Sequence, residues 1–339
     1  FTTNRGRLVV YDLLKNKKTE GKYESFSSKP IFFEKKILVG TMSGKILTIN
    51  TSAKSEDVIV LPRDYGPASY ICLTKNEFYI GTWKGSILIY TRKGKKPFIL
   101  NELRGQVGPI TGIILRNGNL YSSAQDGTVR VWKLDEKKTI HIFKHTRPLQ
   151  AMEVSDDGTL VIAAPVSQDL ILWNTKNSPL PVLLKGHEYL VYSTAWSPDM
   201  KLIASASGDC TAKIWDPFER KELKTLVGHS ESVFAVCWNP QGNLVATGSP
   251  DKTLRIWDVA SGNCINIMEH SDTVYTAAWS PNGKYIATGS PEGTLTVWDA
   301  NIGTMQAQLN FNEWIDSLEW TPNNEYIIVN NKYLVYVIE

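Results

Sequence analysis

The stretch Ile203-Ala-Ser-Ala-Ser-Gly-Asp-Cys-Thr-Ala-Lys-Ile-Trp-Asp216 has two close copies further along the chain: Val245-Ala-Thr-Gly-Ser-Pro-Asp-Lys-Thr-Leu-Arg-Ile-Trp-Asp258 and Ile286-Ala-Thr-Gly-Ser-Pro-Glu-Gly-Thr-Leu-Thr-Val-Trp-Asp299. Their tryptophans are 42 and 41 residues apart. Equivalent positions at about the same interval are Tyr11, Ile49, Tyr90, Trp132, Trp173 and Val337. A fixed period of this size indicates a solenoid, a propeller or an array of repeats.

Each repeat divides into short segments that are separated by turn residues. In one repeat, residues 193–197 and 202–206 are predicted strands around the turn 198–200, and residues 211–215 and 223–226 complete a group of four. Short runs broken by Pro, Asn, Asp and Gly indicate antiparallel meanders, and no segment shows sustained helical periodicity. The sequence therefore predicts an all-β fold of four-stranded antiparallel blades, a β-propeller.

Three dipeptides that end in histidine lie at a constant distance from these tryptophans. Gly186-His187 and Gly228-His229 each precede a Trp-Asp pair by 29 residues, and Glu269-His270 keeps the same distance to Trp298-Asp299. This pattern resembles the WD-repeat (WD40) β-propeller family. Residues 101–311 fit the family pattern well, whereas residues 1–100 fit only by period and by turns such as 40–44 and 81–85.

The resemblance implies a buried hydrogen-bonded set in each complete repeat, made of a histidine, a hydroxyl residue, an aspartate and the tryptophan. Two sets are complete: His187, Ser205, Asp209 and Trp215, then His229, Thr247, Asp251 and Trp257. Two are variants, with Glu for Asp in His270, Thr288, Glu292 and Trp298, and with Gln for His in Gln106, Ser122, Asp126 and Trp132. The set of His145 and Trp173 is incomplete, because Ala163 and Ser167 occupy its other positions.

Eight segments carry the first three strands of a blade, so we expect a single propeller domain, 1–339, with eight blades. Residues 1–26 would be a partial blade or closing strands, 27–312 seven repeats, and 313–339 a last blade closed by an N-terminal strand. Residues 18–26 are the expected closing strand, which leaves residues 7–11 surplus. Seven blades with flanking strands of a neighbouring propeller also fit. The opening Phe-Thr-Thr-Asn suggests a fragment of a longer protein.

Composition argues against several functional classes. The net charge of +3 is too small to indicate nucleic-acid binding by itself, and no apolar run approaches the roughly 18 residues of a membrane span. The four cysteines lie far apart without metal-ligand spacing, which favours reduced thiols and a cytoplasmic or nuclear protein. Four of the five histidines occupy the repeat position. We therefore predict no catalytic residue, metal site or cofactor, and a protein that is not an enzyme.

One face of such a propeller is predicted to bind partners. The residue five positions after each histidine is aromatic in three consecutive blades. The residue just before the acidic residue of each turn is expected on the same face, and so are the equivalent positions of the last blade. Clustered exposed aromatic residues are typical of interface hot spots. The predicted partner-binding residues of this top face are Tyr192, Phe234, Tyr275, Trp83, Met42, Gln125, Trp314 and Asp316.

Basic residues gather after the third strand of several N-terminal repeats, in loops that open on the opposite, bottom face. Periodic placement could bring them into one anion-binding sector. They are Lys15, Lys17, Lys18, Arg92, Lys93, Lys95, Lys96, Lys137 and Lys138. The sequence thus predicts a non-catalytic scaffold for protein or peptide partners in a larger assembly. The alternative is a protein that binds nucleic acid or anionic lipid through this basic sector.

Overall fold

The structure is a computed structural model, and it describes residues 7–12, 17–22, 28, 31–33, 36–50, 55–74, 76–91, 99–165, 167–176, 178–311, 314–322, 324, 327–330 and 334–338. The described residues are almost entirely β-strand and turn, with one short 3-10 helix at Arg63–Tyr65. No helix in these ranges is long and apolar enough to cross a membrane.

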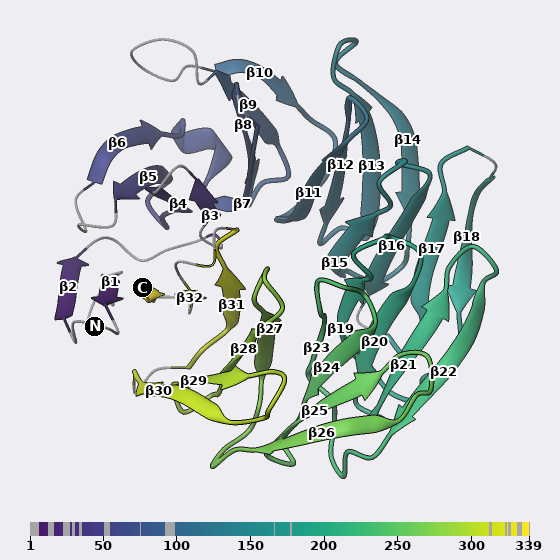
Figure 1. Ribbon diagram of the computed structural model, residues 1–339. Helices are drawn as coiled ribbons and strands as arrows, with labels where there is room; N and C mark the ends of the chain where they lie inside the picture. The colour runs from purple at the N-terminus through teal and green to yellow at the C-terminus, as the bar shows by residue number, and fades with distance from the viewer. Residues whose placement is uncertain are drawn as a thin grey trace. The chain divides into compact units, whose positions relative to one another are not determined.

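The described strands form eight sheets, seven of four strands and one of five (Figure 1). Three of the four-stranded sheets are β3 (Ile31–Phe33), β4 (Lys36–Gly40), β5 (Lys45–Asn50), β6 (Ser55–Val60); β7 (Ala68–Leu73), β8 (Glu77–Thr82), β9 (Ile87–Thr91), β10 (Ile99–Leu103); and β11 (Ile110–Arg116), β12 (Asn119–Ala124), β13 (Thr128–Lys133), β14 (Lys138–Lys144).

The next four sheets repeat the same order of neighbouring strands. They are β15 (Leu149–Val154), β16 (Leu160–Pro165), β17 (Leu170–Asn174), β18 (Ser178–Leu184); β19 (Val191–Trp196), β20 (Ile203–Ser207), β21 (Thr211–Asp216), β22 (Lys221–Val227); β23 (Ala235–Trp238), β24 (Leu244–Gly248), β25 (Thr253–Asp258), β26 (Cys264–Glu269); and β27 (Thr276–Trp279), β28 (Tyr285–Gly289), β29 (Thr294–Asp299), β30 (Met305–Asn310). The prediction of an all-β fold made of four-stranded antiparallel blades is therefore confirmed.

The last sheet uses strands from both ends of the chain. Its order is β2-β1-β33-β32-β31, with β31 (Ser317–Trp320), β32 (Ile327–Asn330), β33 (Leu334–Ile338), β1 (Arg7–Asp12) and β2 (Lys17–Lys22). The strand beside β33 is β1, which pairs with it in parallel, and β2 pairs antiparallel with the other edge of β1. The apolar Leu-Val-Val-Tyr segment thus takes the inner place that was expected for residues 18–26. The Lys-rich segment forms the edge, where charged residues discourage further pairing.

Strand positions in the repeats follow from local sequence. The four strands β19 to β22 begin and end within two residues of the predicted ones. The turn between β19 and β20 puts Met200 at φ +55°, and the Ser197 hydroxyl accepts the N–H of Leu202 at 2.9 Å. Turn residues therefore close each hairpin while the alternating apolar residues face inward.

The chain divides into two compact units, each with its own core. Unit 1 comprises residues 1–165, 173–181 and 332–339, and unit 2 comprises 166–172 and 182–331. In unit 1, one cluster of buried residues joins the sheets β7–β10 and β11–β14 and includes Tyr79, Ile113 and Trp132. In unit 2, an equivalent cluster joins β19–β22 to β23–β26 and includes Val236 and Trp257. The hydrophobic core of each unit therefore lies between successive sheets.

The first strands of neighbouring sheets lie side by side within unit 2. β19 contacts β23, β23 contacts β27, and β27 contacts β31. Residues at the start of these strands therefore meet, although they are about 41 positions apart in the sequence. This packing positions the aromatic side chains described below.

Candidate functional site

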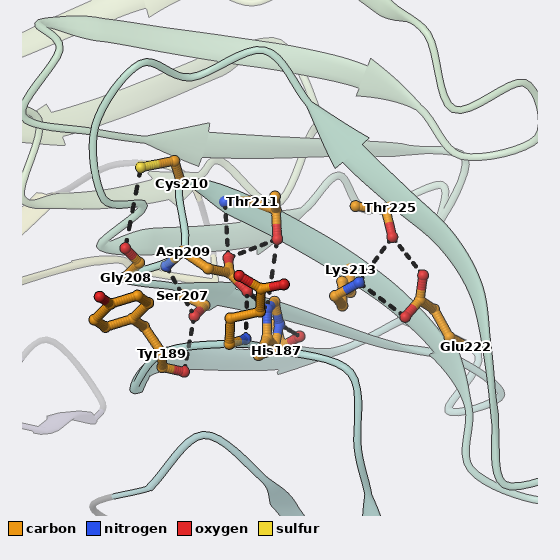
Figure 2. Close-up of polar contacts among 12 residues, drawn as sticks. His187, Tyr189, Ser207, Gly208, Asp209, Cys210, Thr211, Lys213, Glu222 and Thr225 are labelled. Carbon is orange, nitrogen blue, oxygen red and sulfur yellow. Dashed lines mark hydrogen bonds and ion pairs between the residues drawn. The ribbon is translucent and has the colours of Figure 1, made fainter.

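A polar cluster around His187 ties the loop before β19 to the turn between β20 and β21. His187 Nδ1 lies 2.8 Å from Asp209 Oδ2, and its Nε2 lies 2.7 Å from Ser205 Oγ. The indole N–H of Trp215 donates to the same Ser205 hydroxyl at 2.7 Å. Figure 2 shows His187 beneath the Asp209 turn, with Thr211 on the same carboxylate. The four predicted residues of this set are thus in mutual contact.

The carboxylate of Asp209 accepts further donors from the loop and the turn. Its Oδ2 accepts the N–H of Glu188 at 3.0 Å, and its Oδ1 accepts both the N–H and the hydroxyl of Thr211. Burial alone would raise the pKa of Asp209, but hydrogen bonds from Thr211, Glu188 and His187 lower it below its usual value. Asp209 is therefore an ionised acceptor that fixes the loop to the turn.

The same geometry recurs in the next sheet. His229 Nδ1 lies 2.8 Å from Asp251 Oδ2, and its Nε2 lies 2.7 Å from the Thr247 hydroxyl. That hydroxyl also accepts the indole N–H of Trp257 at 2.8 Å. Ser230 and Thr253 donate to the two oxygens of Asp251, as Glu188 and Thr211 do to Asp209.

One proton arrangement satisfies every member of these sets. A carboxylate only accepts, so Nδ1 of His187 carries its proton and donates to Asp209, and Nε2 then accepts from the Ser205 hydroxyl. That hydroxyl in turn accepts from Trp215. Burial lowers the pKa of both His187 and His229, which favours this neutral form.

The Ser–His–Asp geometry resembles a hydrolase triad, but its burial argues for a structural role. Ser205 is 0% exposed, and its proton and lone pairs are committed to His187 and Trp215. A nucleophile must reach a substrate carbonyl, which a fully buried hydroxyl does not. Thr247 is equally buried in the repeated set. We interpret both sets as hydrogen-bonded supports that hold the surface loops.

The third set differs from the sequence expectation. Glu292 is exposed, and His270 Nδ1 lies 3.0 Å from the carbonyl oxygen of Met268. His270 Nε2 accepts the indole N–H of Trp298 at 3.0 Å and lies 2.9 Å from the Thr288 hydroxyl. Glutamate is one methylene longer than aspartate, and it does not take the place of the aspartate as the partner of Nδ1. A cavity lined by His270, Asp272 and Thr294 lies at this position.

The two remaining sets, those of Gln106 and Trp173, have fewer hydrogen bonds between their predicted members. In the glutamine variant, Ser122 Oγ donates to Gln106 Oε1 at 2.6 Å and accepts from Trp132 at 2.8 Å, whereas Asp126 reaches Gln106 only through Thr128. In the incomplete set, the indole N–H of Trp173 is buried without an acceptor in the described part of the chain. Trp173 instead stacks on Phe143, with ring centroids 5.5 Å apart.

An ion pair between buried Lys213 and exposed Glu222 lies on the strand side of the His187 cluster. Lys213 donates to Glu222 and to the Thr225 hydroxyl, each at 2.8 Å, as Figure 2 shows.

On the turn side of the His187 cluster, Cys210 follows Asp209. Burial and the carboxylates of Asp209, Glu231 and Asp251 raise the pKa of the Cys210 thiol. The thiol is therefore protonated near neutral pH, which argues against a reactive cysteine.

Four aromatic side chains form a continuous row in unit 2. The ring centroids of Tyr192 and Phe234 are 4.9 Å apart, those of Phe234 and Tyr275 are 5.6 Å apart, and those of Tyr275 and Trp314 are 5.0 Å apart. All three contacts are edge-to-face. Tyr192 and Trp314, at the two ends, are 46% and 47% exposed, whereas the two central rings are half-buried. We call these four residues the aromatic row.

The other predicted top-face residues are distributed over both units. Asp316 lies two residues after Trp314, and its charge, after burial, raises the pKa of Tyr275. Met42, Trp83 and Gln125 are exposed residues of unit 1. Trp83 and Gln125 each lie in a turn. The backbone N–H of Trp83 donates to the Pro67 carbonyl, and that of Gln125 donates to the Pro109 carbonyl. A partner-binding role for all of these residues stays a prediction.

Most of the predicted basic sector lies outside the residues whose side chains the structure describes. This holds for Lys15, Lys17, Lys18, Arg92, Lys93, Lys95 and Lys96. Of the two that are described, Lys138 forms an ion pair with Glu136, which also pairs with Lys133. Lys137 is exposed in the turn, with φ at +53°. The local pairing weakens the electrostatic case for an anion site at Lys138.

A second series of tryptophans recurs on the first strands, two of them link neighbouring sheets, and the sequence analysis did not single it out. The indole N–H of Trp238 donates to the carbonyl of Ala195, and that of Trp320 donates to the carbonyl of Ala278, each at 3.0 Å. Both bonds run from the first strand of one sheet to the first strand of the sheet before it. Trp196, Trp238, Trp279 and Trp320 recur every 41 or 42 residues, a signal that could have revealed them.

The buried histidines predict acid sensitivity. Burial lowers the pKa of His270 to about 4, so the unfolded chain binds a proton between pH 6.5 and about 4 that the folded chain does not. The free energy of unfolding should therefore fall as the pH decreases through this window, by up to about 1.4 kcal/mol per pH unit for each such histidine. His270→Gln, which copies the native Gln106 set, should reduce this slope. Urea midpoints measured between pH 7.5 and 4.5 test this, and an unchanged slope would contradict it.

Comparison with known families identifies two matches. Residues 148–332, more than half of the chain, match the family described as the IFT122 first beta-propeller. Residues 98–133 match the family described as WD domain, G-beta repeat.

Curated relatives match about a third of the chain. Periodic tryptophan protein 2 of Arabidopsis thaliana is 33% identical over 108 residues, which are 31% of this chain and 12% of that protein. Target of rapamycin complex subunit wat1 of Schizosaccharomyces pombe is 29% identical over 117 residues, 32% of this chain and 37% of that protein. The Chromatin assembly factor 1 subunit FAS2 homolog of Oryza sativa subsp. japonica is 31% identical over 104 residues, 29% of this chain and 21% of that protein. Each alignment therefore spans well under half of the relative.

A solved structure shares the fold over nearly the whole chain. The computationally designed Ika8 protein superposes with a TM-score of 0.76 at 19% identity, covering 92% of this chain and 95% of its own. At this identity the likeness shows the fold alone.

Proposed function

We propose that this chain, which belongs to the WD-repeat family described as the IFT122 first beta-propeller, is a non-catalytic scaffold. In this proposal it binds a protein or peptide partner. We place the binding surface at the aromatic row. Two of the relatives are named as subunits of complexes, a target of rapamycin complex and chromatin assembly factor 1, which supports a role in an assembly. A cytoplasmic or nuclear location is part of the proposal.

The observation that carries this proposal is the exposure of large rings at the two ends of the row. Tyr192 and Trp314 leave nearly half of their surface in water, and exposed Tyr189 and Leu190 lie in the loop just before β19, the strand that carries Tyr192. Edge-to-face packing holds the rings in place, so that a partner would bury them at little further entropic cost. The rigid hydrogen-bonded sets of His187 and His229 anchor the loops that precede β19, which carries Tyr192, and β23, which follows Phe234.

Substitution of Phe234 and Tyr275 by alanine tests the proposal. Loss of the two central rings should remove most partner capture, because hot-spot rings contribute about 2 kcal/mol or more each. The measurement is affinity capture with quantitative mass spectrometry, with the unmodified chain and the variant compared side by side.

Matched controls separate binding from folding. Phe218 and Ile302 are exposed apolar residues in turns at the far ends of their strands, and Phe218→Ala with Ile302→Ala should leave capture unchanged. The single variants Tyr192→Ala and Trp314→Ala remove exposed end rings and should weaken capture without lowering the melting temperature. Full capture by the folded double variant would place the interface on another surface.

A further inference from the structure

The loops that surround the aromatic row are strongly acidic. Segments 187–192, 207–211, 229–234, 249–253, 270–275, 290–294 and 314–316 of unit 2 hold seven carboxylates and one ammonium group. The carboxylates are those of Glu188, Asp209, Glu231, Asp251, Asp272, Glu292 and Asp316, and the ammonium group is that of Lys252. The three histidines in these segments have lowered pKa values because they are buried, and so they do not offset this charge at neutral pH.

Carboxylates lie near both ends of the row. At one end, the backbone of Gly208 packs against the side chains of Tyr189 and Tyr192. The charge of exposed Glu231 contributes to raising the pKa of the nearby Cys210 thiol. Toward the other end, Asp316 follows the end ring Trp314 by two residues, and its charge, after burial, raises the pKa of the Tyr275 phenol. A ligand that covered the rings would therefore meet negative charge at both ends.

Asp272 lies in the loop that leads to Tyr275, and one of its carboxylate oxygens lacks a donor in the described part of the chain. Asp272 Oδ1 accepts the N–H of Thr273 at 2.6 Å, but the buried Oδ2 has no hydrogen-bond partner in the described part of the chain. Asp272 lines the cavity beside His270, two positions before Val274 and three before Tyr275. Asp272 therefore adds a negative charge in the loop that leads to Tyr275, and a cationic side chain of a partner would be attracted to it.

We propose that the segment recognised at the aromatic row is a basic peptide that presents arginine or lysine side chains to the rings and the surrounding carboxylates. This inference rests on the proposed function and adds the chemistry of the partner. The faces of Tyr and Trp rings attract cations, and a guanidinium can stack on a ring while it pairs with a carboxylate. The excess of negative charge also disfavours acidic partners and nucleic acid.

Selection from a random dodecapeptide phage library tests the inference. The full chain is used as bait, and the Phe234→Ala, Tyr275→Ala double variant is used to discard peptides that bind elsewhere. We expect the retained peptides to be enriched in arginine and lysine. Retained peptides that are neutral or acidic would overturn the charge inference but leave the proposed function standing. If no peptide depended on the two rings, both would be overturned.

Charge variants then test the carboxylates individually, by fluorescence anisotropy with one selected basic peptide. Glu231→Gln and Asp272→Asn should each weaken binding about threefold to tenfold at low salt, whereas Lys252→Asn should strengthen it. Glu219→Gln makes the same charge change as Glu231→Gln but in the turn at the opposite end of β21, and it should have no effect. Equal effects of Glu231→Gln and Glu219→Gln would mean that only net charge matters, which would overturn recognition by these carboxylates.

Discussion

Asp251→Ala should lower the free energy of unfolding by about 3 to 5 kcal/mol, whereas Glu292→Ala, at the same position of the next repeat, should change it by less than about 0.5 kcal/mol. The Asp251 side chain is 5% exposed and accepts four hydrogen bonds. The donors are His229 Nδ1 at 2.8 Å, the N–H of Ser230 at 3.1 Å, and the N–H and hydroxyl of Thr253 at 3.0 and 2.7 Å. Alanine leaves these donors without an acceptor, the costly way to lose a hydrogen bond.

Glu292 is a matched control because the hydrogen bonds of its repeat do not depend on this carboxylate. Its side chain is exposed, and the corresponding histidine, His270, donates to the Met268 carbonyl instead. Asp251→Asn, which keeps one acceptor oxygen, should fall between the two alanine variants. Urea unfolding followed by tryptophan fluorescence measures all three. Equal midpoints for Asp251→Ala and Glu292→Ala would show that the carboxylate does not support its loop.

Gly127→Ala should destabilise the protein by several kcal/mol, and Gly118→Ala should cost only about 1 kcal/mol. Both glycines belong to the sheet β11–β14, and both have left-handed φ angles, +79° and +74°. The conformational cost of alanine is therefore similar at the two positions. The difference lies in the space around them: a Cβ on Gly127 would lie 2.3 Å from the His145 carbonyl oxygen and 3.0 Å from that of Arg147, whereas a Cβ on Gly118 meets nothing within 4 Å.

The Gly127 clash is with backbone that cannot easily move. The N–H of His145 donates to the Gly127 carbonyl at 2.8 Å, which fixes the loop that follows β14 against the turn between β12 and β13. Thermal unfolding of the two variants measures the difference. A Gly127→Ala variant as stable as Gly118→Ala would mean that this loop is free to shift, contrary to the packing described.

The spacing of tryptophans and turn residues was sufficient to predict the sheets. Trp132, Trp173, Trp215 and Trp257 are all buried on the third strands of their sheets, as the period indicated. Hairpins are formed by neighbouring residues, so their signals are local, and repetition makes each signal easier to recognise. The resemblance to the WD-repeat family likewise identified the residues around His187 and His229 that the structure brings into contact.

Pairing between the chain ends depended on tertiary structure. Several strands of similar character compete for the edge of the last sheet, and the parallel pairing of β1 with β33 joins residues from opposite ends of the sequence. No local pattern selects among such long-range pairings, because the choice rests on the total packing of each alternative.

The sequence by itself determined the repeat, the strand order within the seven four-stranded sheets and the buried tryptophans. Only the tertiary structure decided that Glu292 faces solvent while His270 turns to a carbonyl, and that four aromatic rings form one row. The physical reason is the same in both cases. Whether one more methylene fits a buried site, or whether rings about 41 residues apart touch, depends on distances between packed strands, which are set when the sheets pack together.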